Sequence, residues 1–137
     1  MTGRAAQRKG AHAERELAQA LSDILGVEVR KGSSPYLPGL VAPDVYGVEG
    51  IHVEVKRREA FSLPAALKQS RSDCRQGDVA VVCHRPNRCA WMITVELADL
   101  PQLARAVVAI LEAARSIPQF NQVFHEAAQD GAGKAAG

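Results

Sequence analysis

The chain has 137 residues, a length that suits one domain with its own core. Hydrophobic residues make up 47% and charged residues 23%, which is typical of a globular protein and excludes a largely disordered chain. No apolar run approaches the roughly 20 residues that cross a bilayer, and residues 1–10 lack the apolar stretch of a signal peptide, so we expect a cytoplasmic protein with no membrane partner.

The first half of the chain predicts one helix followed by three strands. Apolar residues at helical spacing indicate a helix over 10–25, which Gly26 ends. Residues 27–31 read as a short strand and 32–43 as a loop rich in proline. Two further strands, 44–48 and 51–57, are joined by a tight turn that contains Gly50.

The second half predicts a helix, two strands and a long helix. Ser62 is a candidate N-cap for a helix that runs to about Arg75. Residues 78–83 read as a strand covered on both faces, 89–95 as another strand, and 98–115 as an amphipathic helix. This order predicts an α/β fold with a central mixed five-stranded sheet flanked by helices. We expect one domain over residues 1–117, followed by a C-terminal extension, 118–137, that is partly disordered.

Glu14 occupies an unexpected position in the first predicted helix. On a wheel of about 100° per residue it falls in the middle of the apolar stripe, next to Leu17, Leu21 and Leu25. A carboxylate that faces a core is costly unless it is paired, protonated or bound to a metal. The plainer alternative is that Glu14 reaches solvent or pairs with a nearby Lys or Arg.

The strand over 51–57 places His52, Glu54 and Lys56 on one face, opposite an apolar face. A three-residue loop over 48–50 would put Asp44 opposite Glu54 on that face, whereas a two-residue turn would not. Two carboxylates are a usual protein contribution to a Mg²⁺ site, and the ion would polarise a scissile phosphate and activate a water. Lys56 would then orient that water and offset the charge that builds on the phosphate. His52 is expected to be packed or solvated rather than a ligand.

Pro43-Asp44, followed after nine residues by Glu54-Val55-Lys56, resembles the signature of the PD-(D/E)XK nuclease superfamily. The run from Arg8 to Leu17, with Lys9-Gly10 and then Glu14, resembles the opening helix of the archaeal-type Holliday junction resolvases. The resemblance extends over roughly Arg8–Leu97 and implies a restriction-endonuclease-like fold.

The resemblance also implies roles for individual residues. Asp44, Glu54 and the Val55 carbonyl would bind Mg²⁺, with Mn²⁺ as a substitute, and Lys56 would be the catalytic lysine. Glu14 would complete the metal shell or help to hold a second ion. A catalytic serine is implied in the loop after the first strand, where Ser34 or Ser33 fits. Gln69 is similar to an accessory position and is equally well read as a surface glutamine.

Three hypotheses about function follow. The first is a metal-dependent, structure-selective DNA endonuclease that resolves four-way (Holliday) junctions as a homodimer, because a two-fold dimer presents two matched active sites. The second is another PD-(D/E)XK DNA nuclease, acting in repair, restriction or a phage. The third is a non-catalytic DNA-binding protein of the same fold. The net charge of +2 does not separate them, but the basic clusters supply candidate contacts to DNA: Arg8, Lys9, Arg30, Lys31, Arg57 and Arg58, to which we add Gln69.

Overall fold

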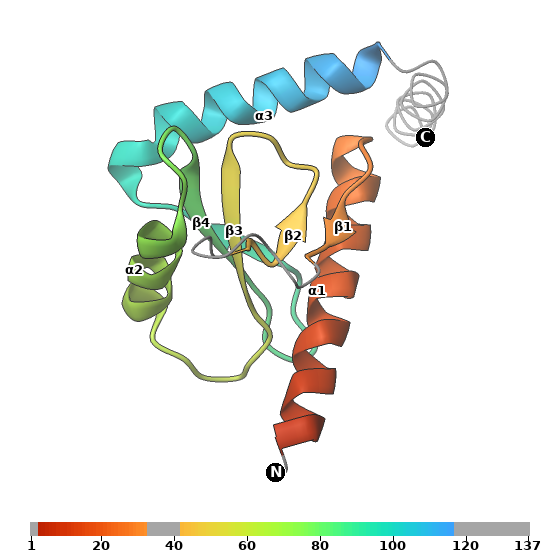
Figure 1. The fold of residues 1–137 in the computed structure, drawn as a ribbon, viewed down its shortest axis with the longest axis vertical. Coiled ribbons are helices and arrows are strands. Elements are labelled where there is room, and N and C mark those ends of the chain that lie inside the picture. Colours follow the sequence, from red (N-terminus) through yellow and green to blue (C-terminus); the bar gives the residue numbers. More distant parts are fainter. Residues whose placement is uncertain (1–2, 33–41, 117–137) are drawn as a thin grey trace, which may run out of the picture.

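The computed structural model describes residues 3–32 and 42–116, and these form an α/β arrangement of two small sheets and three α-helices (Figure 1). The elements, in chain order, are α1 (Gly3–Leu25), β1 (Arg30–Lys31), β2 (Val45–Tyr46), β3 (Ile51–Lys56), α2 (Leu63–Asp73), β4 (Val79–His84), β5 (Met92–Thr94), the 3₁₀ turn η1 (Leu97–Asp99) and α3 (Leu100–Arg115).

The larger sheet has the order β3-β4-β5. Strands β3 and β4 are parallel, with Ile51 opposite Val79 and Lys56 opposite His84, and β5 is antiparallel to β4. Strands β1 and β2 form a separate antiparallel pair. The mixed sheet of the sequence prediction is therefore present, but its five strands are divided three and two among the residues that the structure describes.

The core lies around β4, the central strand of the larger sheet. Every residue from Val79 to Cys83 is buried, and Val81 and Val82 are fully so, which confirms the prediction of a strand covered on both faces. On one face, Val53 and Val81 pack in a cluster with Leu17 of α1 and with residues of α3. Helix α2 packs against β3 and β4 on the other side of the sheet from α1 (Figure 1).

Helix α2 begins where the sequence predicts. The Ser62 side chain accepts a hydrogen bond from the Ala65 N–H at 3.2 Å, which caps the first turn. On the buried face of the helix, Ser70 Oγ lies 3.3 Å from the carbonyl oxygen of His52 and 3.0 Å from that of Val81. One fully buried hydroxyl thus contacts both parallel strands at the level of His52.

Several predicted boundaries were wrong. Helix α1 begins at Gly3 rather than at residue 10, because its first turns are fully exposed and carry no apolar periodicity to be read. The strands predicted over 27–31, 44–48 and 89–95 are shorter, and the helix predicted over 98–115 begins as the 3₁₀ turn η1. Residues 33–41 and 117–137 lie outside the described residues; they include Ser33, Ser34 and the predicted C-terminal extension.

None of the helices in 3–32 and 42–116 combines the length and apolar character that crossing a membrane requires.

Candidate functional site

Asp44 attaches the segment before β2 to the outer edge of β3. Its backbone N–H donates a hydrogen bond to the Val53 carbonyl at 3.3 Å, and its carboxylate Oδ2 accepts one from the Val55 N–H at 2.8 Å. A side-chain oxygen therefore stands where a neighbouring strand would offer a backbone carbonyl. This explains why β2 and β3 do not form a ladder in the described residues.

The sequence left open whether the turn before β3 would place Asp44 opposite Glu54. The turn closes through a hydrogen bond from the Ile51 N–H to the Val48 carbonyl, with two residues between them, and Asp44 bonds to Val53 and Val55, on either side of Glu54. Gly47, which adopts a φ of +105°, precedes this turn. The carboxylate reaches β3 because the backbone is irregular, and not because of the parity of a regular hairpin.

The Val55 carbonyl faces the same edge of β3 as Asp44. In a strand, the N–H and C=O of one residue point to the same side. The Val55 N–H points to Asp44, whereas the carbonyl of the next residue, Lys56, points to the β4 side and accepts from the Arg85 N–H. The Val55 oxygen and the Asp44 carboxylate therefore lie on one edge of the sheet.

Glu54 and Lys56 project from the same face of β3. The Lys56 Nζ lies 3.4 Å from Glu54 Oε1, and the two side chains are 27% and 17% exposed, respectively. Burial and the charge of Asp44 raise the pKa of the Glu54 carboxyl, while Lys56 lowers it. The alternation predicted for this strand thus places an ammonium and a carboxylate side by side in a half-buried position.

Glu14 comes from α1, beside the buried residues Ala13 and Leu17. Its Oε2 lies 3.9 Å from the Nζ of Lys31, and its side chain is 25% exposed. Burial first, and then the charge of Asp44, raise the pKa of Glu14; Lys31 lowers it and Glu54 raises it further. Both sequence readings hold in part, since Glu14 is half-buried and also paired with a lysine.

Three carboxyl groups from three parts of the chain therefore influence one another. The pKa values of Glu14, Asp44 and Glu54 are all raised, with burial as the largest cause in each, and the negative charge of Asp44 adds to the rise at both glutamates. A cation placed among them would relieve both the repulsion and the cost of burial.

The donor set suits a hard cation such as Mg²⁺, which takes oxygen ligands and often only one or two carboxylates together with waters. Asp44 and Glu54 could supply the carboxylates, and Val55 could supply a carbonyl oxygen on the edge that Asp44 occupies. No group of three or more His, Cys, Asp or Glu side chains within 3–32 and 42–116 is arranged to hold a metal ion by itself. Any such site in these residues would therefore draw on water or a substrate oxygen.

Asp73 is a residue of this region that the sequence prediction missed. It ends α2, and its charge raises the pKa of both Asp44 and Glu54. Gln69, one turn earlier, donates a hydrogen bond from Nε2 to Asp73 Oδ2 at 2.7 Å. The available signal was the spacing of four residues from Gln69, which places the two side chains on one face of a helix.

His52 is packed, which is one of the two surroundings that the sequence predicts for it. The residue is 4% exposed, and its backbone carbonyl accepts a hydrogen bond from Ser70 Oγ of α2 at 3.3 Å. Burial lowers the pKa of His52, while the charges of Asp73, Asp44 and Asp78 raise it.

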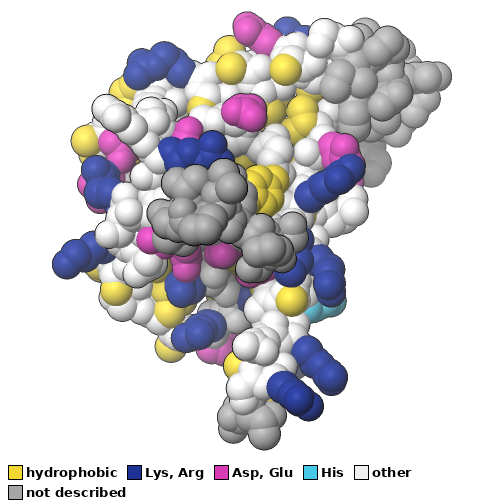
Figure 2. Space-filling view, viewed as in Figure 1, with side chains coloured by type: hydrophobic (Ala, Val, Ile, Leu, Met, Phe, Trp, Pro, Cys, Tyr) yellow, Lys and Arg dark blue, Asp and Glu magenta, His cyan; other side chains and the backbone are white. Residues whose placement is uncertain are grey.

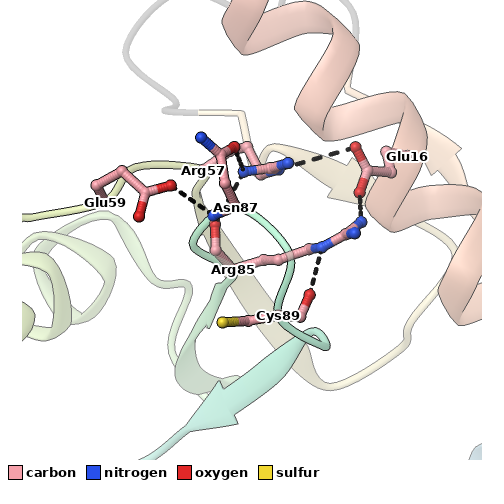
Figure 3. A network of polar contacts seen from close by, with 6 residues as sticks. All are labelled: Glu16, Arg57, Glu59, Arg85, Asn87 and Cys89. Carbon is pink, nitrogen blue, oxygen red and sulfur yellow. Dashed lines mark hydrogen bonds and ion pairs between the residues drawn. The ribbon is translucent and has the colours of Figure 1, made fainter.

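Arg57 and Arg58 follow β3 directly and have different surroundings. Arg57 belongs to a polar network (Figure 3): its Nη1 donates to Asn87 Oδ1 at 2.9 Å, and its Nε lies 3.9 Å from Oε2 of Glu16. Glu16 also pairs with Arg85, so α1 is tied to the end of β3 and to the turn after β4. Arg58 is exposed and has no hydrogen bond or ion pair with any described residue.

The other predicted basic contacts divide in the same way. Arg30 pairs with the exposed Glu28, and Lys31 pairs with Glu14. Arg8 and Lys9 are exposed on α1 and have no partner within the described part of the chain. Figure 2 shows Lys and Arg side chains gathered along the lower part of α1.

A groove of about 350 Å³ lies between α1 and the end of β3. Its lining includes Lys9, Gly10 and Glu14 from the helix, and Lys56 and Arg58 from the end of β3 and the residues that follow. Two residues of the candidate site, Glu14 and Lys56, therefore open onto a groove with basic walls.

Comparisons with known proteins were made by family, by curated relatives and by solved structures. No protein-family model and no curated protein matches the chain. Among solved structures, the chain is similar to Hjc from Archaeoglobus fulgidus, a Holliday junction resolvase from an archaeal hyperthermophile. The two are 22% identical over 61% of this chain and 74% of that chain, with a TM-score of 0.48.

Proposed function

We propose that this chain is a Mg²⁺-dependent DNA endonuclease whose active site consists of Glu14, Asp44, Glu54 and Lys56. The observation that carries the proposal is the hydrogen bond from the Val55 N–H to the Asp44 carboxylate. That bond fixes the Asp44 carboxylate at the edge of β3 beside the Val55 carbonyl, on the strand that also carries the Glu54–Lys56 pair. Lone surface acids would not have this arrangement.

In this proposal Asp44, Glu54 and the Val55 carbonyl hold the ion, and Glu14 completes its shell or helps to hold a second. When bound, Mg²⁺ supplies the positive charge that activates a water and stabilises the departing oxygen of a phosphodiester. Mn²⁺ is expected to substitute because it accepts the same oxygen donors.

Lys56 is assigned the role of orienting the attacking water and offsetting negative charge on the phosphate. Its ammonium is held 3.4 Å from Glu54, so it is positioned before substrate arrives. Asp73, held by Gln69, is assigned an outer electrostatic role, because its negative charge acts on both Asp44 and Glu54.

The proposed substrate is branched DNA, with the four-way junction as the preferred form and a homodimer as the active species. This part rests on the motif over 43–56 and on the resemblance of residues 8–17 to archaeal-type resolvases. Two matched cuts on a junction require two matched active sites, which a two-fold dimer provides. The protein would act in the cytoplasm, encoded by a bacterium, an archaeon or a phage.

The test is cleavage of a synthetic four-way junction with Mg²⁺ by the wild type, Glu54→Gln and Glu49→Gln. Glu49 is the matched control, because it is an exposed glutamate in the turn before β3. We expect paired, symmetric nicks from the wild type and Glu49→Gln and none from Glu54→Gln. Cleavage of linear or flapped DNA alone would keep the active site and favour another nuclease of the superfamily. No cleavage of any DNA with Mg²⁺ or Mn²⁺ would refute the catalytic proposal and favour the DNA-binding alternative.

A further inference from the structure

Gly10 lies in the interior of α1, where glycine is the least favourable residue other than proline. Packing within the described residues does not require it. A Cβ built at Gly10 meets no atom within 4 Å beyond its chain neighbours and the helix's own backbone. Alanine would therefore fit at this position and would favour the helix. Because the fold gives no reason for the glycine, we look for one in a molecule that approaches the helix from outside.

The space over Gly10 is the groove between α1 and the end of β3. Lys9 stands beside Gly10 on the helix wall, and Arg58 lies on the opposite wall. Neither cation has a hydrogen bond or ion pair with the described residues, in contrast to Arg57, which the network of Figure 3 engages. The groove therefore combines two unengaged cations with a stretch of bare helix backbone.

We propose that the sugar-phosphate backbone of a DNA strand crosses α1 at Gly10, where the absence of a side chain lets a phosphate lie close to the helix between Lys9 and Arg58. This inference rests on the proposed function. Phosphates are bound by clustered Lys and Arg, and glycine is the residue that admits a close approach by another backbone. Because Glu14 and Lys56 line the same groove, the strand held at Gly10 is the one presented to the active site.

The test compares Gly10→Ala and Gly10→Leu with the wild type, and Gly3→Ala is the matched control. A Cβ at Gly3 also meets nothing within 4 Å, but Gly3 does not line the groove. The measurements are the melting temperature and the dissociation constant for a four-way junction, determined without divalent cations, followed by cleavage with Mg²⁺.

We expect Gly10→Ala to raise the melting temperature by about 2–4 °C, because alanine favours the helix. The same variant should weaken junction binding by about tenfold, and Gly10→Leu by more, because the added atoms fill the space of the phosphate. Gly3→Ala should bind within about twofold of the wild type. Lys9→Ala and Arg58→Ala should each reduce the slope of log K against log salt by about 1.

Two results would overturn the inference alone: wild-type binding by both Gly10 variants, or a lower melting temperature for Gly10→Ala, which would show that the glycine serves the fold. If the wild type binds junctions but does not cleave, and the Gly10 variants bind more weakly, this inference stands and the nuclease proposal fails. If the wild type binds no DNA, both fail.

Discussion

Replacing Asp44 by Asn or by Ala separates its hydrogen bond from its charge. Asparagine keeps an oxygen that accepts from the Val55 N–H, whereas alanine leaves that part-buried N–H without its 2.8 Å partner. Loss of a hydrogen bond to a charged acceptor costs about 1.5–3 kcal/mol. Part of this cost is offset, because burial raises the pKa of Asp44 and its charge is therefore unfavourable in the folded state.

We therefore expect Asp44→Ala to lower the free energy of unfolding by about 1–2 kcal/mol in metal-free buffer at neutral pH. Asp44→Asn should stay within about 0.5 kcal/mol of the wild type or exceed it, because it keeps the acceptor and removes the buried charge. Both variants should lose at least about 100-fold in cleavage rate, because neither retains the carboxylate assigned to the metal.

The sign of the pH dependence provides a second check. Because the folded-state pKa of Asp44 lies above its ordinary value of 3.8, the unfolded chain loses the proton first as the pH rises. The wild type thus loses stability through Asp44 as the pH rises above 3.8, until the folded-state pKa is passed. Asp44→Asn lacks this contribution, so its advantage over the wild type should grow over that interval and then level off.

The assay is urea unfolding in EDTA, with junction cleavage measured in parallel. Equal losses of stability in Asp44→Asn and Asp44→Ala would show that the fold needs the negative charge, which refutes the reasoning. Retention of cleavage by Asp44→Asn would remove Asp44 from the proposed ligands.

Three further predictions concern charge and backbone. Glu14→Gln should raise the free energy of unfolding in EDTA at neutral pH, because burial and the charge of Asp44 raise the pKa of Glu14. This gain in stability should shrink as the pH falls toward 4.5, and a loss of stability at neutral pH would contradict the prediction. Glu16→Gln should lower the free energy of unfolding in urea by about 1–2 kcal/mol, because Glu16 has two part-buried arginine partners. Glu28→Gln, whose arginine partner is exposed, should lower it by less than about 0.5 kcal/mol, and equal losses would argue against a structural role for the network. Gly47→Ala should lower the free energy of unfolding by at least about 2 kcal/mol, because the φ of Gly47 is +105° and the added Cβ would lie 2.2 Å from the Glu28 carbonyl oxygen. Gly77→Ala, with a φ of +94° and open space around the Cβ, should lower it by about 1 kcal/mol. Calorimetry that shows the reverse order would contradict the steric argument.

The sequence predicts best those elements whose signal is local. The Ser62 cap and the buried strand β4 each depend on residue types within a few positions, and both were predicted correctly. The five-stranded sheet was not, because a side chain of Asp44 takes the Val55 N–H that a ladder would have used. Alternation along a strand gives the face of each side chain, but it does not show which distant group will occupy an edge.

The candidate site divides in a similar way. The apolar stripe singled out Glu14, and the motif singled out Asp44, Glu54 and Lys56. The influence of Asp73 was not predicted, because it depends on how the end of α2 lies over β3. Arg57 and Arg58 looked equivalent as neighbours in a basic run, yet only Arg57 has acceptors within reach among the described residues, since Glu16 arrives from a distant helix.

Helix α1 passes through two environments along one continuous backbone. Residues 3–10 are exposed, whereas Ala13, Leu17 and Ala18 are buried against the sheet. Because local opening follows burial, amide hydrogens before about Gly10 should exchange with solvent at rates near those of an isolated helix, and those after Ala13 at rates set by unfolding of the domain. A single helix would then contain both weakly and strongly protected amides, and the exchange rates of its first turns would report directly on any ligand that orders them.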